Sequence, residues 1–247
     1  MILFALRAQS KLEFLRFLRN GRALFFTLLV PIGYYLIFSY GFGNTHALQL
    51  HFGIAMAGFG TSGVSLGTLG SRLAQERQLG WLRLRQTTPL SPLAYFAAKV
   101  LATFSMAGMT IICVLTVALL EGLRVDNYWA LVASALILWC GSLPFIALAF
   151  VIGSWTDAET GYIVSIGVYL VLGYLGGLLQ PLQLMPGVLQ DVARFLPSAH
   201  YLLLALRPLQ AASSGSALED VLLLLGYTVL FTALAIWSYR RSATAGR

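Results

Sequence analysis

Ser62 and three histidines are the residues best suited to covalent chemistry. Ser62 lies in Gly60-Thr61-Ser62-Gly63, and the histidines are His46, His51 and His200. A serine becomes a nucleophile when a histidine within hydrogen-bond reach accepts its proton. His46 and His51 lie at the mouth of the apolar run that contains Ser62, and His200 lies among prolines. These positions give little support to a serine–histidine pair.

The motifs around Ser62 leave one enzyme hypothesis open. The GxSG segment resembles that of rhomboid intramembrane proteases, so a protease with Ser62 as nucleophile stays an alternative. Residues 63–67 also match the GxSxG elbow of hydrolases, but that motif needs a strand, a turn and a helix, and here it lies inside one apolar run. The histidines form no HExxH pattern, and Cys113 and Cys140 form no CxxC pattern. The sequence therefore predicts no metal site.

Composition places the chain in a membrane. It has 247 residues, of which 58% are hydrophobic and 10% charged, and its mean hydropathy is +0.80. Soluble domains have about one-quarter charged residues. Six apolar runs are each long enough for the roughly 20 helical residues that cross a bilayer. They are residues 23–41, 50–70, 100–120, 129–153, 160–180 and 221–239. The sequence therefore predicts an all-α membrane protein with six transmembrane helices in a single domain, residues 1–247.

Basic residues lie mainly beside the ends of these runs. With the amino terminus in the cytoplasm, twelve of the sixteen fall on cytoplasmic segments: Arg7, Lys11, Arg16, Arg19, Arg22, Arg72, Arg77, Arg83, Arg85, Arg240, Arg241 and Arg247. The positive-inside rule describes this bias, so both termini are expected in the cytoplasm. The net charge of +7 does not indicate nucleic acid, because no stacking aromatic residues interleave with the basic ones.

Residues 1–22 combine basic and apolar side chains. The basic residues are spread over several helical turns instead of preceding a short apolar core, which disfavours a cleaved signal peptide. An amino-terminal interfacial helix is expected, although its basic residues do not share one face.

The predicted spans carry almost no charge. Ion-coupled transporters keep ionisable residues inside the bundle, and no inverted repeat with broken helices is evident. A secondary transporter is therefore a weaker alternative. Lys99 lies just before the third span, from where its long side chain could carry the ammonium to the membrane boundary. GxxxG segments at residues 63–67 and 173–177 predict close helix packing.

The longest polar interruption in the first half of the chain is residues 75–92. Leu79 and Leu82 are three residues apart, so a helix would place them as apolar neighbours among charged side chains. Pro89 and Pro92 end the stretch. It is too polar to enter lipid and too apolar for a linker. It is expected to lie against the membrane surface or a partner protein.

Residues 181–208 are too apolar for an ordinary loop. Prolines at 181, 186, 197 and 208 nevertheless forbid one continuous spanning helix. Short re-entrant helices that dip into the outer leaflet are expected, as an external hairpin between the fifth and sixth spans. This hairpin either seals the bundle or takes part in substrate exit, and the sequence leaves both open.

The order of these segments resembles the permease subunits of ABC-2 type transporters, which export drugs, lipids and polysaccharides. The resemblance covers nearly the whole chain. It rests on Glu76-Arg77-Gln78-Leu79-Gly80 with Leu82, on Thr88-Pro89-Leu90-Ser91, and on Gln180-Pro181, Leu184-Met185-Pro186, Leu196-Pro197, Tyr201 and Arg207. It implies a six-span subunit that pairs with a second copy or a close relative and docks two separate ATPase subunits.

The resemblance also implies roles for single residues. Residues 71–92 would form a coupling region with a cytoplasmic helix, and the acidic turn at residues 155–160 would be a lesser contact. The residues that would touch the ATPase are Glu76, Arg77, Leu79, Gly80, Leu82, Asp157 and Glu159. The exit segment would include Pro181, Met185, Pro186, Pro197, Tyr201 and Arg207. A solvated membrane-surface loop is the alternative for both coupling segments.

No ATP site is expected on this chain. A P-loop needs Gly-Lys-Ser or Gly-Lys-Thr, and the only lysines, Lys11 and Lys99, follow Ser10 and Ala98. ATP and Mg²⁺ would bind the partner ATPase, and this chain would be a transport subunit without a cofactor. Apolar spans suit an amphipathic drug-like or lipid-like cargo, with a lipid-linked glycan as an alternative. The expected location is the bacterial plasma membrane, in contact with lipid.

Overall fold

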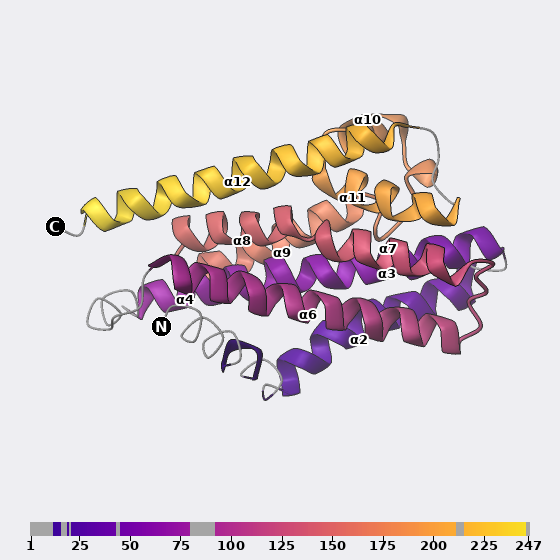
Figure 1. The fold of residues 1–247 in the computed structure, drawn as a ribbon, viewed down its shortest axis with the longest axis horizontal. Helices are drawn as coiled ribbons and strands as arrows, with labels where there is room; N and C mark the ends of the chain where they lie inside the picture. The colour runs from indigo at the N-terminus through magenta and orange to yellow at the C-terminus, as the bar shows by residue number, and fades with distance from the viewer. Residues whose placement is uncertain are drawn as a thin grey trace.

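Helices form all the regular structure that the described part of the chain contains (Figure 1). The computed structural model describes residues 12–15, 19, 21–42, 45–79, 92–210 and 215–245. Its elements are α2 (Gly21–Phe42), α3 (His46–Gly63), η1 (Val64–Gly70), α4 (Ser71–Gln78), α6 (Pro92–Leu120), α7 (Tyr128–Cys140), α8 (Leu143–Trp155), α9 (Ala158–Leu175), η3 (Leu182–Leu184), α10 (Gly187–Ala193), α11 (Pro197–Leu206), η4 (Arg207–Leu209) and α12 (Ala217–Ala245). The predicted all-α class is confirmed.

Five helical segments in the described ranges are long and apolar enough to cross a membrane. They are His46–Glu76, Tyr95–Leu120, Tyr128–Trp155, Ala158–Leu175 and Ala217–Ser238. The apolar part of α2, Thr27–Gly41, is shorter. Five of the six predicted spans are thus supported, and the first span stays a prediction.

Two helix ends differ from the predicted spans. The fourth span is interrupted, because α7 ends at Cys140 and α8 begins at Leu143, with Pro144 in its first turn. The fifth span is shorter than predicted. After Leu175 the chain turns at Gly177, whose positive φ of 81° is a conformation that glycine adopts readily.

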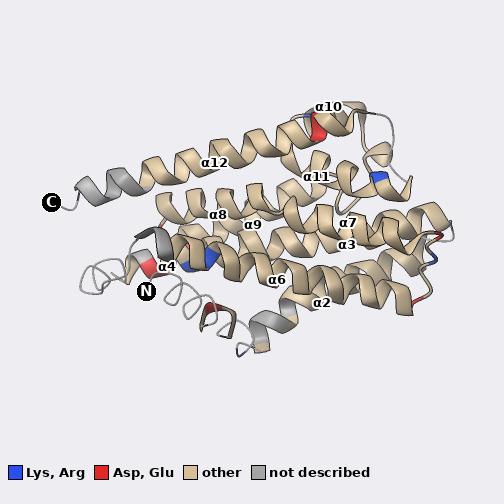
Figure 2. Ribbon diagram, viewed as in Figure 1, with Lys and Arg blue, Asp and Glu red and all other residues tan. Residues whose placement is uncertain are grey.

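The core lies around α3, most of whose residues are buried. Figure 1 places α4 and the carboxyl end of α12 at one end of the bundle, and α10 and the 121–127 turn at the other. Charged residues gather toward these two ends, and the middle of the bundle is tan in Figure 2, the colour of uncharged residues. Large apolar side chains such as Ile112 and Val229 are exposed on the outer surface of the helices. This distribution is typical of a bundle whose middle is surrounded by lipid.

The predicted interfacial helix lies mostly outside the described residues. Residues 12–15 are helical, and Phe14 packs against Val64, Ala102 and Met106. This short segment therefore contacts the bundle itself.

Candidate functional site

The helix α4 carries the described part of the predicted coupling region, and it packs closely on α8 and α9. A Cβ atom at Gly153 would lie 2.5 Å from the Cβ of Leu73, and one at Gly161 would lie 2.6 Å from the Cβ of Ala74. Such distances leave no space for any side chain at either glycine. The two glycines therefore allow α4 to lie almost backbone to backbone against the ends of α8 and α9.

The acidic turn meets α4 at the same end of the bundle. The side-chain oxygen Oε1 of Gln78 accepts a hydrogen bond from the amide of Ala158 at 3.3 Å. Asp157 caps α9, because its carboxylate accepts from the amide of Thr160 at 2.8 Å and from the hydroxyl of Thr160 at 3.1 Å. These donors lower the pKa of Asp157 below its ordinary value. The two predicted coupling segments are thus joined into one unit.

The predicted coupling residues differ in their surroundings. Leu79 is 72% exposed at the end of α4, and Asp157 and Glu159 are exposed. The side chain of Glu76 instead points inward to a cluster on α6. The Arg77 side chain, Gly80 and Leu82 lie outside the described part of the chain, so their roles stay predictions.

The inner cluster consists of Lys99, Glu76, Glu13 and Tyr95. The ammonium of Lys99 donates to Glu76 Oε1 at 2.8 Å and lies 3.5 Å from Glu13 Oε1. The hydroxyl of Tyr95 donates to Glu76 Oε2, and the Lys99 ammonium lies 5.0 Å from the centre of the Tyr95 ring. The Lys99 side chain is 2% exposed. Its ammonium is therefore enclosed by carboxylates of the protein and is not turned outward.

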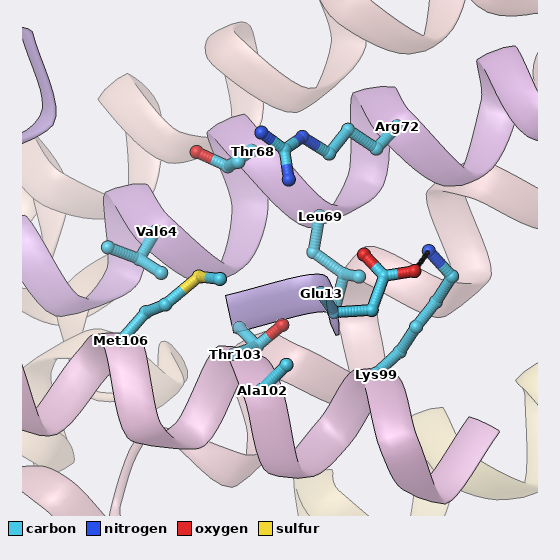
Figure 3. A pocket seen from close by; sticks show the side chains of 9 residues that line it. All are labelled: Glu13, Val64, Thr68, Leu69, Arg72, Lys99, Ala102, Thr103 and Met106. Carbon is cyan, nitrogen blue, oxygen red and sulfur yellow. Dashed lines mark hydrogen bonds and ion pairs between the residues drawn. The ribbon is translucent and has the colours of Figure 1, made fainter. Parts of the chain in front are cut away.

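A small pocket adjoins this cluster (Figure 3). One wall comes from η1 and α4 and the other from α6, and Glu13 lies between them beside Lys99. The lining residues are Glu13, Val64, Thr68, Leu69, Arg72, Lys99, Ala102, Thr103 and Met106. The pocket leaves free space beside the Lys99–Glu13 pair.

The segment between the fifth and sixth spans is divided by its prolines, as predicted. Pro181 precedes η3, Pro186 precedes α10, and Pro197 is the first residue of α11. Met185 is buried. Because α11 packs against α3, α7, α9 and α12, it forms part of the bundle at this end.

Tyr201 on α11 satisfies the backbone at the break between α7 and α8. The amide of Ser142 bonds the carbonyl of Trp139 at 3.2 Å, so the Leu138 carbonyl loses its regular helical donor. The hydroxyl of Tyr201 donates to that carbonyl at 2.9 Å. A Cβ atom at Gly141 would lie 2.7 Å from the Tyr201 ring, so the break also makes space for it.

The outer cluster consists of Asp220, His200 and Arg207. Asp220 Oδ1 lies 2.7 Å from His200 Nδ1, and Asp220 Oδ2 accepts from Arg207 Nε and Nη2 at 3.0 and 2.7 Å. His200 Nε2 lies 2.8 Å from the Arg194 carbonyl, and Arg207 Nη1 donates to the Gly215 carbonyl at 2.9 Å. The cluster ties α11 and η4 to the first turn of α12.

Comparison with known proteins decides the family. A family model described as "ABC-2 family transporter protein" matches residues 44–237. The chain belongs to the ABC-2 transporter family. It is 30% identical over 248 residues to "Putative transport permease YvfS" of Bacillus subtilis (strain 168), with 96% of this chain and 97% of that protein covered. The matched region contains α4, the acidic turn and the segment between the fifth and sixth spans.

The geometry of this ABC-2 family member does not favour the protease hypothesis. Ser62 donates to the carbonyl of Phe59 in its own helix at 2.9 Å. His51 lies eleven residues earlier in that helix, about 16 Å away along its axis. The imidazoles of His46 and His200 bond the carbonyl of Arg124 and the outer cluster. Within the described residues, no group of three His, Cys, Asp or Glu side chains could hold a metal ion.

Sequence reasoning did not find the buried ion-pair roles of two charged residues at span ends. Lys99 belongs to the segment Tyr95–Leu120 and Asp220 to Ala217–Ser238. Both residues lie near an end of their segment, which agrees with spans that carry almost no charge. Each apolar run continues as a helix over its charged residue. This continuation is the signal that could have placed Lys99 and Asp220 in the helices.

Proposed function

We propose that this chain is the permease subunit of an ATP-driven exporter in a bacterial plasma membrane. It pairs with a second copy or a close relative, and two separate ATPase subunits dock on its cytoplasmic end. Both termini lie in the cytoplasm. The cargo is amphipathic and drug-like or lipid-like, because the spans are apolar over most of their length.

One observation carries the proposal: α4 and the acidic turn form a single surface at one end of the bundle. Close packing at Gly153 and Gly161 and the Gln78–Ala158 hydrogen bond connect this surface to α8 and α9. A force applied by an ATPase at Leu79 would therefore reach two spans at once. Such contiguous packing is what a mechanical link between sites requires.

The energy source is ATP and Mg²⁺ bound to the partner subunits. Neither lysine of this chain stands in a P-loop. The permease contributes no covalent step, and the binding of ATP by its partner changes the position of α4. Arg77, Gly80 and Leu82 complete the ATPase contact in this proposal.

The opposite end of the bundle serves the exit of the cargo. Pro181, Met185, Pro186 and Pro197 shape short helices there, and Tyr201 and Arg207 hold α11 and η4 against α7 and α12. In this proposal residues 181–208 close the outer end of the cargo path through the permease when no cargo is released.

Purification of the chain from its native membrane tests the proposal. An ATPase without membrane spans is expected to co-purify. Leu79→Asp should lower its recovery by about tenfold or more, because an exposed apolar contact is replaced by a charge. Leu184→Asp is the matched control, since Leu184 is similarly exposed at the other end. Recovery of no ATPase, or equal loss with both variants, would contradict the proposal.

A further inference from the structure

The inner cluster holds one cation between two carboxylates from distant parts of the chain. Glu76 belongs to α4, Glu13 to the helical residues 12–15, and Lys99 to α6. The two acid side chains are 24% and 12% exposed, whereas Lys99 is 2% exposed. The three side chains therefore connect three segments that are far apart in sequence.

The two carboxylates are not equivalent partners of Lys99. The 2.8 Å distance to Glu76 is that of a charge-assisted hydrogen bond, whereas the 3.5 Å distance to Glu13 is that of a longer ion pair. A buried ammonium is stable only with a carboxylate nearby. If Glu76 moves away, Lys99 must find its charge partner in Glu13.

The packing around the cluster permits such a movement. Glu76 lies on α4, which packs mainly on α8 and α9, whereas Phe14 beside Glu13 packs on Ala102 and Met106 of α6. The pocket in Figure 3 leaves space beside Lys99 and Glu13. The π-helical segment η1 leads directly into α4, and π-helical turns are frequently found at functional sites.

We propose that Lys99 exchanges its ion-pair partner, and that this exchange links the position of α4 to the docking of residues 12–15. With α4 in place, Lys99 is bonded to Glu76 at 2.8 Å and lies 3.5 Å from Glu13. When α4 withdraws, Lys99 shortens its contact with Glu13 and holds residues 12–15, which already lie on α6, more tightly in place. The force that moves α4 rests on the proposed function, but the exchange is a property of this chain alone.

Disulfide formation between Phe14→Cys and Met106→Cys measures the docking of residues 12–15. The purified chain is placed in lipid nanodiscs without an ATPase, with Cys113 and Cys140 replaced by alanine. Glu76→Gln, which mimics withdrawal, should speed disulfide formation by about fivefold, and Glu13→Gln should slow it by about fivefold. Glu219→Gln makes the same charge change at an exposed site on α12 and should have no effect.

A second pair of variants isolates the role of the cation. In a Lys99→Met background, the rate of disulfide formation should be the same with Glu76 and with Glu76→Gln. In a Lys99→Arg background, Glu76→Gln should still speed disulfide formation. A Glu76→Gln rate that is unchanged, or lowered as in Glu13→Gln, would show that the cluster is a fixed scaffold and overturn the proposal. Because no ATPase is present, failure of the ATPase co-purification would leave these results valid and would remove only the proposed driving force.

Discussion

The inner and outer clusters have opposite compositions. In the inner cluster, at the α4 end of the bundle, the cation Lys99 lies between two acids, and in the outer cluster, at the opposite end, the acid Asp220 lies between His200 and Arg207. The outer contacts of Asp220 are all within 3.0 Å. The inner contacts of Lys99 are unequal, at 2.8 and 3.5 Å. Both carboxylate oxygens of Asp220 are thus paired, and the outer cluster holds its helices in one arrangement. The unequal contacts of Lys99 allow it to exchange partners.

The clusters also differ in what they connect. The outer cluster joins residues close in sequence, from α11 to the start of α12, and so fixes one compact region. The inner cluster joins residues 13, 76 and 99, which lie on three separate segments. A charged cluster that bridges separately packed segments can couple their positions, and this is the basis for placing movement at the inner end.

Removing the single acid of the outer cluster should have the largest effect on stability. Asp220→Ala leaves Arg207 and His200 together without a carboxylate, and breaking a buried ion pair in this way costs about 3–5 kcal/mol. Thermal unfolding in detergent measures the loss. The neighbouring Glu219 is exposed, so Glu219→Ala should leave the melting temperature nearly unchanged. An equal fall in melting temperature in the two variants would show that the ion pairs of Asp220 do not stabilise this region.

Filling the space between α4 and α8 should have the next largest effect. The added methyl of Gly153→Ala would meet the Cβ of Leu73 and, at 3.0 Å, the carbonyl of Gly70. Overpacking of this kind costs about 1–3 kcal/mol. Gly167→Ala is the matched control on α9, since nothing lies within 4 Å of its new methyl. Chemical denaturation compares the two, and a stable Gly153→Ala protein would show that α4 is not rigidly joined to α8.

Tyr201→Phe should destabilise the protein less than the two preceding changes, because it removes a single hydrogen bond between α11 and α7. The variant keeps the buried ring but removes the donor to the Leu138 carbonyl, which should cost about 1–2 kcal/mol for an unsatisfied buried acceptor. Tyr174→Phe removes a hydroxyl from an exposed side chain and is the control. If both variants unfold at the same temperature, water or another donor satisfies the carbonyl.

The smallest effect is expected at Asp157. Hydrogen bonds from Thr160 lower the pKa of Asp157 in the folded protein. Its contribution to stability as a helix cap is therefore fully present when the pH is above the ordinary carboxyl pKa. It is lost as the pH falls through the lower pKa of the folded protein. Asp157→Ala should lower the melting temperature slightly at pH 7, with the difference disappearing in acid. Asp157→Asn should retain most of the cap. A pH-independent difference would contradict this interpretation.

The parts of the fold that depend on local chemistry could be predicted from sequence. Apolar runs gave five supported spans, and Pro181, Pro186 and Pro197 gave the starts of short helices. Pro144 gives a local signal for the break after Cys140, but Tyr201, which donates to the Leu138 carbonyl there, lies about 60 residues later in the chain. Lys99 turned inward for a similar reason, because its partners Glu13 and Glu76 are brought to it only by the fold. Contacts between distant segments thus set the limit of the sequence-based predictions.

The GxxxG predictions show the same limit within single motifs. A Cβ at Gly63 would meet the Tyr169 ring at 3.0 Å, and one at Gly173 would meet Phe59 at 2.6 Å, so close packing is confirmed at these two glycines. Gly67 has nothing within 4 Å, and Gly177 serves a turn. The spacing alone could not separate packing glycines from the others.

Site-specific photocrosslinking from the two ends of the bundle tests the central claim most directly. A photoreactive residue at position 79, at the exposed end of α4, is compared with one at position 188, where Val188 is exposed on α10. The measurement is the identity of the proteins captured in native membranes. The expected result is a strong crosslink from position 79, and none from position 188, to an ATPase that lacks membrane spans. Capture of no ATPase from position 79, or equal capture from both positions, would contradict the assignment of α4 as the coupling element.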